Sequence, residues 1–261
     1  MDRNKVMEDF GKLLDIMNRL RAECPWDREQ TLDTLRTLTI EETYELSDAI
    51  LENDLHEISK ELGDLLLHIV FYAKIGEEKN AFDMDYVINR LCEKLIYRHP
   101  HVFGTVEADN SAEVIRNWEQ LKIREKDGNK SVLSGVPKGL PALVKAYRVQ
   151  DKVRALGFDW EAREQVWDKV TEEIGEFRAE WEKADADRME AEFGDVLFAL
   201  VNAARLYGIN PETALERTNR RFIDRFEYLE EKTIKQGRSL KDMTLEQMEE
   251  IWQEAKGCDK E

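Results

Sequence analysis

The chain is poor in residues that cross-link or interrupt a fold, with three cysteines and five prolines among 261 residues. Disulfide frameworks and zinc sites need paired, closely spaced ligands, whereas Cys24, Cys92 and Cys258 are scattered, so we expect reduced thiols. A membrane helix needs a run of about 18 apolar residues, and the sequence has none. The charged start, MDRNKVMEDF, is unlike a signal peptide. We therefore expect a soluble, cytoplasmic protein.

Positive charge is also scarce, because the chain has 39 Lys and Arg against 56 Asp and Glu, which gives a net charge of -17. Duplex nucleic acid and anionic membranes bind positive surfaces, so we expect neither as a partner. The hydrophobic fraction of 42 % and the six tryptophans indicate a globular protein with a real core. A phosphorylated small molecule remains compatible with this charge if a metal ion supplies the positive charge.

The sequence predicts an all-α fold, because apolar residues recur at helical spacing and almost no alternating strand pattern occurs. The stretch KDGNKSVLSGVPKG at 126–139 lacks that spacing and is rich in Gly, Ser and Pro, which is typical of a linker. We predict two tandem helical bundle domains, 1–126 and 139–261, joined by a linker at 127–138. The helices are expected near 4–22, 31–52, 55–78, 84–98, 111–126, 140–155, 162–183, 186–207, 212–236 and 245–257.

The two halves repeat each other in detail, which indicates a tandem duplication. In each half a run of glutamates, EETYE or EEIGE, is followed 16 residues later by a second acidic pair, in ELGD or EFGD. A pair of basic residues comes next, in KLIYR at 94–98 and RFIDR at 221–225, and then a WxxxK motif. The repeated carboxylates are Glu42, Glu45, Glu61 and Asp64 in the first half and Glu173, Glu176, Glu192 and Asp195 in the second.

The repeated carboxylates predict a metal site. Residues three apart on a helix share a face, and the interval of 16 residues lets a helical hairpin bring two such pairs together. Two like charges about 5 Å apart repel by roughly 3 kcal/mol at an effective dielectric of 20, so four together need counter-charge. Ligands that are all oxygen suit Mg2+, with Mn2+ as a substitute, and such ions also bind substrate phosphates. The alternative is that acidic residues only coat solvent-facing helices.

The basic and aromatic residues of the repeat are candidate ligands for phosphate and base. Lys94 and Arg98, and likewise Arg221 and Arg225, lie on one helical face each and suit phosphate oxygens, although such pairs also occur as surface ion pairs. The tryptophans of the repeat serve either as core anchors or as stacking platforms. His68 has Ala199 at the equivalent position, so we interpret it as a packed or second-layer residue. The WxxxK motifs are Trp118 with Lys122 and Trp252 with Lys256.

Together these motifs resemble those of a known family. EETYE with ELGD, EEIGE with EFGD, the basic pairs, WxxxK, and the stretches CPWDREQT, RHPHVF and LPALVKAYRVQDKVRALGFDW look like a two-domain MazG-type nucleoside triphosphate pyrophosphohydrolase of the all-α superfamily. The resemblance covers nearly the whole chain. It implies a homodimer that cuts a nucleoside triphosphate to the monophosphate and pyrophosphate with Mg2+.

Carried over residue by residue, the resemblance assigns roles to the repeated positions. Water attacks the α-phosphorus, and a glutamate of an ExxE pair accepts the proton from that water. The second domain is expected to be the main catalyst, since Asn219 and Arg221 stand where the first half has Cys92 and Lys94. The expected metal ligands are Glu173, Glu176, Glu192, Asp195, Glu42, Glu45, Glu61 and Asp64; the catalytic candidates are Glu173, Glu176, Glu42 and Glu45; the phosphate-binding candidates are Arg221, Arg225, Lys256, Lys94, Arg98 and Lys122; the base or ribose candidates are Trp160, Trp252 and Asn219.

Three alternatives remain open at this point. A dUTPase-like or phosphoribosyl-ATP pyrophosphatase-like enzyme shares the carboxylates but favours one substrate. A di-iron protein of the ferritin type also places carboxylates inside helix bundles, but it requires ExxH pairs that this chain lacks. A non-catalytic helical scaffold uses acidic clusters only for solubility or an interface, and it predicts no metal dependence.

Overall fold

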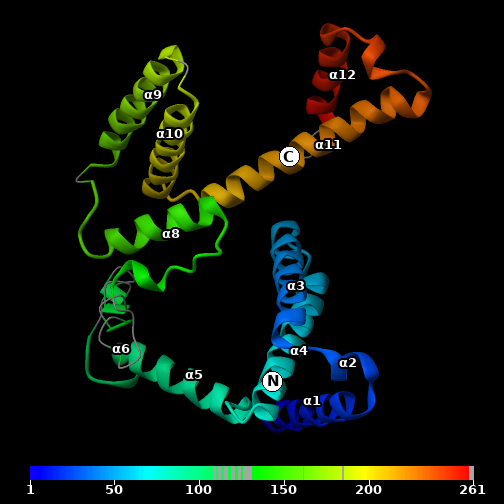
Figure 1. Ribbon diagram of the computed structural model, residues 1–261, viewed down its shortest axis with the longest axis vertical. Helices are drawn as coiled ribbons and strands as arrows, with labels where there is room; N and C mark the ends of the chain where they lie inside the picture. The colour runs from blue at the N-terminus through cyan, green and yellow to red at the C-terminus, as the bar shows by residue number, and fades with distance from the viewer. Residues whose placement is uncertain are drawn as a thin grey trace. The chain divides into compact units, whose positions relative to one another are not determined.

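The computed structural model confirms the all-α prediction (Figure 1), because every regular element among the described residues is a helix. The chain divides into two compact units, Met1–Glu107 and Ala108–Glu261. Most of the predicted helix at 111–126, and residues 126–130 of the predicted linker stretch, lie outside the described residues, so the linker bounds stay a prediction. The structure describes residues 1–107, 110, 113–114, 117–118, 121–122, 125, 131–160, 162–183 and 185–258, the last of them by its backbone alone.

The first unit is built around a helical hairpin of α3 and α4, and α1 packs against α4. Local sequence explains why the hairpin forms where it does. Thr31 and Thr34 make a reciprocal capping box at the start of α3. Asn53 then adopts a left-handed conformation with φ of 55°, and the Asp54 carboxylate caps the first turn of α4. The helices are α1 (Arg3–Glu23), α2 (Pro25–Glu29), α3 (Leu32–Glu52), α4 (Leu55–Glu78), α5 (Met84–Arg98) and α6 (Pro100–Phe103).

The second unit repeats this arrangement, with α9 and α10 as the hairpin and α8 packed against α10. Asp185 caps α10, and Gly208 takes a positive φ of 70° just beyond the end of that helix. A further pair, α11 and α12, packs together. The helices are α8 (Ala142–Arg154), α9 (Val166–Lys183), α10 (Ala186–Leu206), α11 (Pro211–Lys232) and α12 (Leu245–Cys258), with short 3-10 turns at Leu133–Gly135, Arg163–Gln165, Ile234–Gln236 and Leu240–Asp242.

The predicted helices within the described residues are all present, with bounds shifted by a few residues. The two short helices α2 and α6 were not predicted. Each begins with a proline, Pro25 or Pro100, whose ring fixes φ near the helical value. Proline has no backbone N–H, but at the first position of a helix that N–H would have no partner within the helix. None of the helices among the described residues combines the length and the apolar character needed to span a bilayer.

Each hairpin has its own small core. In the second unit Val166 and Val170 of α9 pack against Ala199 and Ala203 of α10, so the two helices are joined by small side chains. The first unit uses larger ones. Its core cluster is Met17, Leu35, Val70, Phe71 and Ile75, all at most 2 % exposed.

We predict that Phe71→Ala lowers the free energy of unfolding by about 3–5 kcal/mol, because it leaves a cavity in this tightly packed core. Urea unfolding followed by circular dichroism measures the change. Leu55→Ala is the control, since Leu55 is 75 % exposed and its loss creates no cavity. Equal unfolding midpoints for the two variants would contradict the assignment of this core.

Candidate metal centre

The helical hairpins bring three glutamates together in each unit. In the first unit Glu42 and Glu45 of α3 meet Glu61 of α4, and one carboxylate oxygen of each lies within 4.8 Å of the others. Glu173 and Glu176 of α9 meet Glu192 of α10 in the same way. The fourth predicted ligands, Asp64 and Asp195, lie one turn further along α4 and α10 and are not part of these trios.

Burial makes both trios electrostatically costly. Glu61 is 3 % exposed and Glu173 is 8 % exposed. The Oε2 atom of Glu61 is buried without a hydrogen-bond partner. A buried carboxylate oxygen without a donor or cation retains its full desolvation cost, so the position favours a ligand that supplies positive charge.

In each unit the pKa of one glutamate of the trio is raised. Burial raises the pKa of Glu42, and the negative charges of Asp64, Glu45 and Glu61 raise it further. In the second unit burial raises the pKa of Glu176, followed by the charges of Glu173 and Glu192. Each trio therefore resists full ionisation until a cation is added.

Two lysines that the sequence analysis did not select provide part of the counter-charge. Lys60 Nζ lies 3.0 Å from Glu61 Oε1, and Lys169 Nζ lies 2.8 Å from Glu173 Oε1. These contacts raise the pKa of both lysines. The lysine side chains are 59 % and 37 % exposed, so solvent screens the pairs and one lysine does not neutralise three carboxylates. The sequence indicates the second of these contacts, because Lys169 and Glu173 are four residues apart on a helix and therefore share a face.

The donor set fits a hard divalent cation. All the ligand atoms are carboxylate oxygens, which suit Mg2+ or Mn2+ rather than a softer ion. Opposite ligands of Mg2+ are roughly 4.2 Å apart at its usual metal–oxygen distance. The three oxygens of each trio lie within 4.8 Å of one another, which is compatible with one shared ion.

A cavity of about 560 Å³ adjoins the second trio and has Glu173 and Asp195 in its wall. It lies between α8, the loop that follows α8, α9 and α10. Trp160, which the sequence analysis selected as a base or ribose candidate, lines it. None of the other lining residues was among the site candidates predicted from sequence; they are Val149, Gln150, Val153, Gly157, Phe158, Asp159, Lys169, Phe198, Ala199, Asn202 and Arg205.

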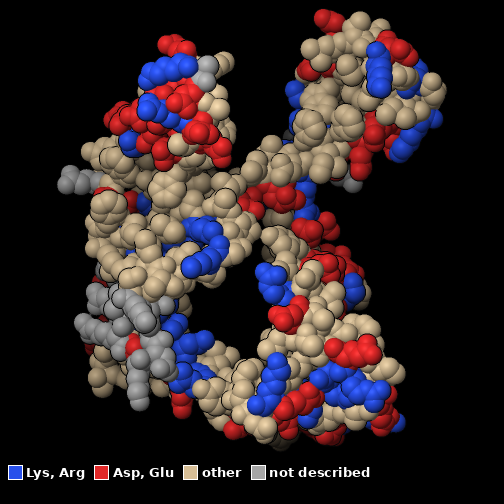
Figure 2. Space-filling view, viewed as in Figure 1, with Lys and Arg blue, Asp and Glu red and all other residues tan. Residues whose placement is uncertain are grey.

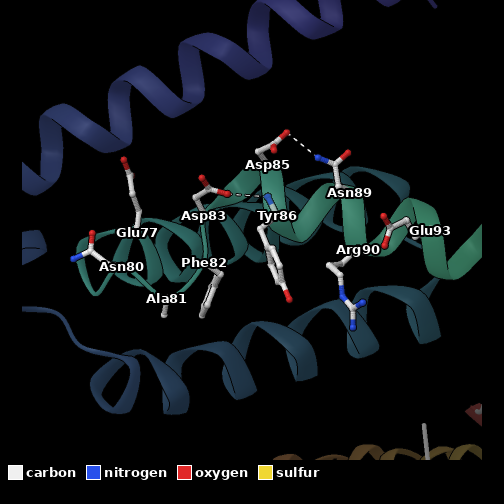
Figure 3. Close-up of a pocket in the computed structure, with 10 residues that line it drawn as sticks. All are labelled: Glu77, Asn80, Ala81, Phe82, Asp83, Asp85, Tyr86, Asn89, Arg90 and Glu93. Atoms are coloured by element: carbon white, nitrogen blue, oxygen red, sulfur yellow. Dashed lines mark hydrogen bonds between the residues drawn. The ribbon is translucent and has the colours of Figure 1, made fainter. Parts of the chain in front are cut away.

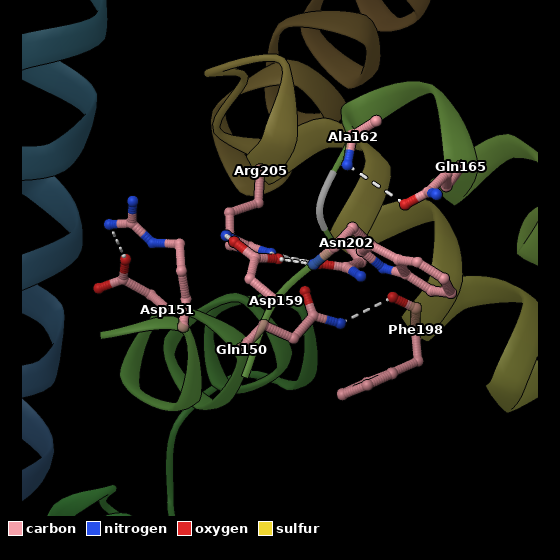
Figure 4. Close-up of polar contacts among 10 residues, drawn as sticks. Gln150, Asp151, Asp159, Ala162, Gln165, Phe198, Asn202 and Arg205 are labelled. Atoms are coloured by element: carbon pink, nitrogen blue, oxygen red, sulfur yellow. Dashed lines mark hydrogen bonds and ion pairs between the residues drawn. The ribbon is translucent and has the colours of Figure 1, made fainter. Parts of the chain in front are cut away.

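A buried ion pair fixes one wall of this cavity (Figure 4). Arg205 donates to both carboxylate oxygens of Asp159 and to Asn202 Oδ1, and its side chain is only 5 % exposed. Burial alone would raise the pKa of Asp159, but the Arg205 guanidinium and the backbone N–H of Trp160 lower it. The pair therefore holds the loop that carries Trp160 against α10.

The predicted phosphate-binding cations lie elsewhere in the described structure. The Arg225 guanidinium stacks over the Trp252 ring at 5.9 Å, and Phe222 also packs on that ring. In the described residues none of Arg221, Arg225 and Lys256 lines the cavity or contributes to the pKa shift of Glu176. Asn219 contacts Glu216 on its own helix. Lys94 and Arg98 lie on α5, and Lys122 lies over Trp118 at 5.8 Å.

The first unit has a polar group where the second has only small apolar residues. Thr39 Oγ1 lies 2.9 Å from His68 Nδ1 and 2.6 Å from the Tyr72 hydroxyl. Burial lowers the pKa of His68, although the charge of Asp64 opposes that shift. His68 is 7 % exposed and packs behind the carboxylates, as the sequence analysis expected.

The first unit also has a cavity of about 590 Å³ along the start of α5 (Figure 3). Its wall carries Glu77, Asp83, Asp85 and Glu93 against the single cation Arg90. So acidic a wall repels phosphate, and none of the predicted metal ligands lines it.

Fold and site together define an all-α protein of two related units, each with a glutamate trio that has one buried member and is suited to a divalent cation. The model of the MazG nucleotide pyrophosphohydrolase domain matches residues 30–103 and 162–229, and the chain belongs to that family. The resemblance read from the sequence is thereby confirmed, and by family the chain is an enzyme and a hydrolase.

Two relatives match almost end to end. The nucleoside triphosphate pyrophosphohydrolase of Escherichia coli (strain K12) is 43 % identical, over 96 % of this chain and 98 % of the relative. The nucleoside triphosphate pyrophosphohydrolase/pyrophosphatase MazG of Thermotoga maritima is 42 % identical, over 96 % of each chain. A nucleoside triphosphate pyrophosphohydrolase of Mycobacterium tuberculosis is 39 % identical over 54 % of this chain and 44 % of its own length.

We predict that Glu176→Gln raises the melting temperature of the metal-free protein at pH 7.5. Because the folded-state pKa of Glu176 is raised, its ionised form destabilises the fold above that pKa. The gain should shrink as the pH falls through the raised folded-state pKa of Glu176 and vanish below the ordinary carboxyl value of 4.5, where wild type is protonated in both states. Thermal unfolding in EDTA measures it. The exposed Glu182→Gln is the matched control, and equal changes in melting temperature for the two variants, at pH 7.5 and again below the ordinary carboxyl value of 4.5, would refute the prediction.

Proposed function

We propose that this chain hydrolyses nucleoside triphosphates to the monophosphate and pyrophosphate in a Mg2+-dependent reaction, with water attacking the α-phosphorus. The observation that carries the proposal is the glutamate trio of each unit, which has one buried carboxylate and is short of positive charge. The printed names of the E. coli and T. maritima relatives supply the substrate class. Mn2+, which accepts the same oxygen ligands, is the expected substitute.

Within the second unit we assign different roles to the carboxylates. Glu173 and Glu192 hold the cation from facing helices, and Asp195 completes the set one turn further along α10. Glu176 is exposed and has a raised pKa, so it is the carboxylate best suited to accept the proton of the attacking water. Mg2+, when bound, offsets the negative charge that develops on the phosphate oxygens. Glu42, Glu45, Glu61 and Asp64 are the corresponding residues of the first unit.

Lys169 is the cation already in contact with the second trio, and we assign it to the phosphates together with Arg221, Arg225 and Lys256. The last three require an approach of α11 and α12 to a carboxylate trio. A second copy of the chain supplies that approach in our proposal, with each trio completed by cations from the partner.

Matching apolar stripes on the two hairpins support the dimer. Leu62, Leu66 and Ile69 follow one another at i, i+4 and i+7 on α4, and each is at least 38 % exposed. The equivalent residues on α10 are Phe193, Leu197 and Leu200, each at least 40 % exposed. Side chains so large, in register on both hairpins, are suited to pack against a second helical pair.

Nucleic acid is not expected as a partner. Acidic side chains, with some basic ones among them, gather on the α9–α10 hairpin (Figure 2). The exposed Glu182, Asp185 and Asp187 lie near the turn of that hairpin. A surface of this charge repels a phosphate backbone unless cations intervene.

We predict Mg2+-dependent pyrophosphate release from the eight common nucleoside triphosphates, lost by at least 100-fold in Glu176→Gln. Removing the proton acceptor costs about that much. Glu45→Gln is the matched variant of the first unit and should retain most activity. Loss only in Glu45→Gln would move the chemistry to the first unit. Activity confined to one nucleotide would favour the narrow dUTPase-like or phosphoribosyl-ATP pyrophosphatase-like alternatives, and no release from any nucleotide would favour the scaffold.

We predict a dimer in solution that Leu197→Glu weakens, since a carboxylate in the stripe on α10 opposes burial of that face. Light scattering after size exclusion gives the mass at several concentrations. Glu190→Ala, on an exposed position of the same helix, is the control. A wild-type monomer under conditions in which the enzyme is active would exclude a site that needs two copies.

A further inference from the structure

The loop after α8 is joined to α10 by a compact set of hydrogen bonds (Figure 4). Arg205 Nη1 donates to Asp159 Oδ2 at 3.0 Å and Nη2 to Oδ1 at 2.5 Å, while Nε and Nη2 donate to Asn202 Oδ1 at 3.1 and 2.8 Å. Asp159 Oδ1 also accepts from the backbone N–H of Trp160 at 3.0 Å. Arginine has five N–H donors, so most of its capacity is used within this set. The pair is therefore suited to hold a neighbour in place rather than to bind a ligand.

The segment that the pair holds carries exposed aromatic side chains. Gly157 and Phe158 are hydrogen-bonded to the last turn of α8, and Gly157 has a φ of 90°, which turns the chain away from that helix. Beyond Phe158 the loop reaches α10 through the Asp159 carboxylate. Trp160 comes next, lines the cavity and is 40 % exposed, so packing alone restrains it weakly. Its place on the cavity wall depends on Asp159.

The first unit also uses one buried arginine at this place, with different partners. Arg21 of α1 donates to both carboxylate oxygens of Glu78, the last residue of α4, at 2.9 and 2.5 Å. It also donates to the backbone carbonyls of Asp27 and Gln30, in the segment that follows α1. Its guanidinium lies over the Phe71 ring at 5.5 Å, so this contact adjoins the core of the first unit.

The two arginines stand at positions that do not correspond. With the carboxylate sets of the units aligned, Arg205 corresponds to Lys74, which pairs with Glu77 on its own helix at 2.8 Å. With LRA of α1 aligned on VRA of α8, Arg21 corresponds to Arg154, which pairs with an aspartate on its own helix at 3.0 Å. Each unit therefore fastens the same segment with its own arginine. In the second unit the acceptor is a side chain of the loop itself, so one substitution can release the loop.

We propose that Asp159 and Arg205 are positioning residues for the reaction of the second unit, whose ion pair keeps Trp160 on the cavity wall beside Glu173 and Asp195, where it meets the substrate. Neither residue of the pair touches the substrate, and both act through Trp160. The proposal rests on the proposed function, because it names what orders a contact to that substrate. Release of the loop weakens substrate binding and leaves the carboxylates of α9 and α10 in place, so the loss appears in KM rather than in kcat.

The first test is kinetic. Asp159→Asn keeps the size of the side chain and removes its charge, and Arg205→Met keeps an apolar stem and removes the donors. Each should raise KM for ATP about 10-fold or more and change kcat by less than about 3-fold, since the carboxylates are untouched. Asp151→Asn is the matched control, because it makes the same exchange in ion pairs within α8, and it should leave KM within about 2-fold of wild type.

A double variant separates positioning from direct contact with substrate. If both residues act only by holding the loop, Asp159→Asn with Arg205→Met should raise KM no more than the larger single change. An increase equal to the product of the two single changes would mean that each residue contacts substrate, and it would overturn the proposal. A wild-type KM in both single variants, with only a lower melting temperature, would also overturn it. Arg205→Lys, which keeps the charge but not the fork, serves if Arg205→Met fails to fold.

A measurement without turnover separates this proposal from the proposed function. Fluorine NMR of protein labelled with 5-fluorotryptophan reports the surroundings of each indole, and Trp160→Phe assigns the Trp160 resonance. In EDTA and without nucleotide, that resonance should move toward the position of a solvent-exposed indole in Asp159→Asn and stay in place in Asp151→Asn. An unmoved resonance in Asp159→Asn would overturn the proposal. Absence of pyrophosphate release from every triphosphate by wild type would refute the proposed function, and the resonance would still decide whether the pair positions Trp160.

Discussion

Mutual repulsion among carboxylates is the constraint around which each unit is built. Three glutamates that each have a carboxylate oxygen within 4.8 Å of the others repel one another, and solvent screens the exposed Glu45 and Glu176 more than the buried Glu61 and Glu173. The hairpin resists this because its helices are joined through a buried core and a capped turn. Burial of apolar side chains in the core of each hairpin opposes that repulsion. A cation at the trio removes the conflict.

Duplication gave two copies of this helical hairpin. The copies keep the same carboxylates but differ in the side chains beside them. In the first unit the corresponding positions hold the large side chains of His68, Phe71 and Tyr72. Thr39 forms hydrogen bonds with both His68 and Tyr72. In the second unit smaller residues leave a cavity beside Glu173. One copy therefore gains packing and the other gains a place for a ligand, which explains why two intact carboxylate sets need not have equal activities.

The helices and the carboxylate sets could be predicted from sequence because both depend on regular spacing. Apolar periodicity fixed the helices, and the equal interval of 16 residues placed Glu61 opposite Glu42 and Glu192 opposite Glu173. Gln150 and Asn202 could not be found in this way, since one amide in a helical pattern resembles any other polar position. The ion pair of Asp159 with Arg205 joins residues that are 46 apart in the sequence, so no local pattern predicts it.

Charge explains why the arginines of α11 matter although they lie apart from the trio in the described structure. A nucleoside triphosphate brings about four negative charges to a site that already has four carboxylates, and one Mg2+ offsets only two of the total. Lys169 adds one more and is partly screened. The remaining charge requires cations with a fixed geometry, and Arg225, stacked on Trp252, is already ordered by an aromatic neighbour. In the proposed dimer, α11 and α12 of a second copy supply these cations, and this charge argument is independent of how the base is recognised.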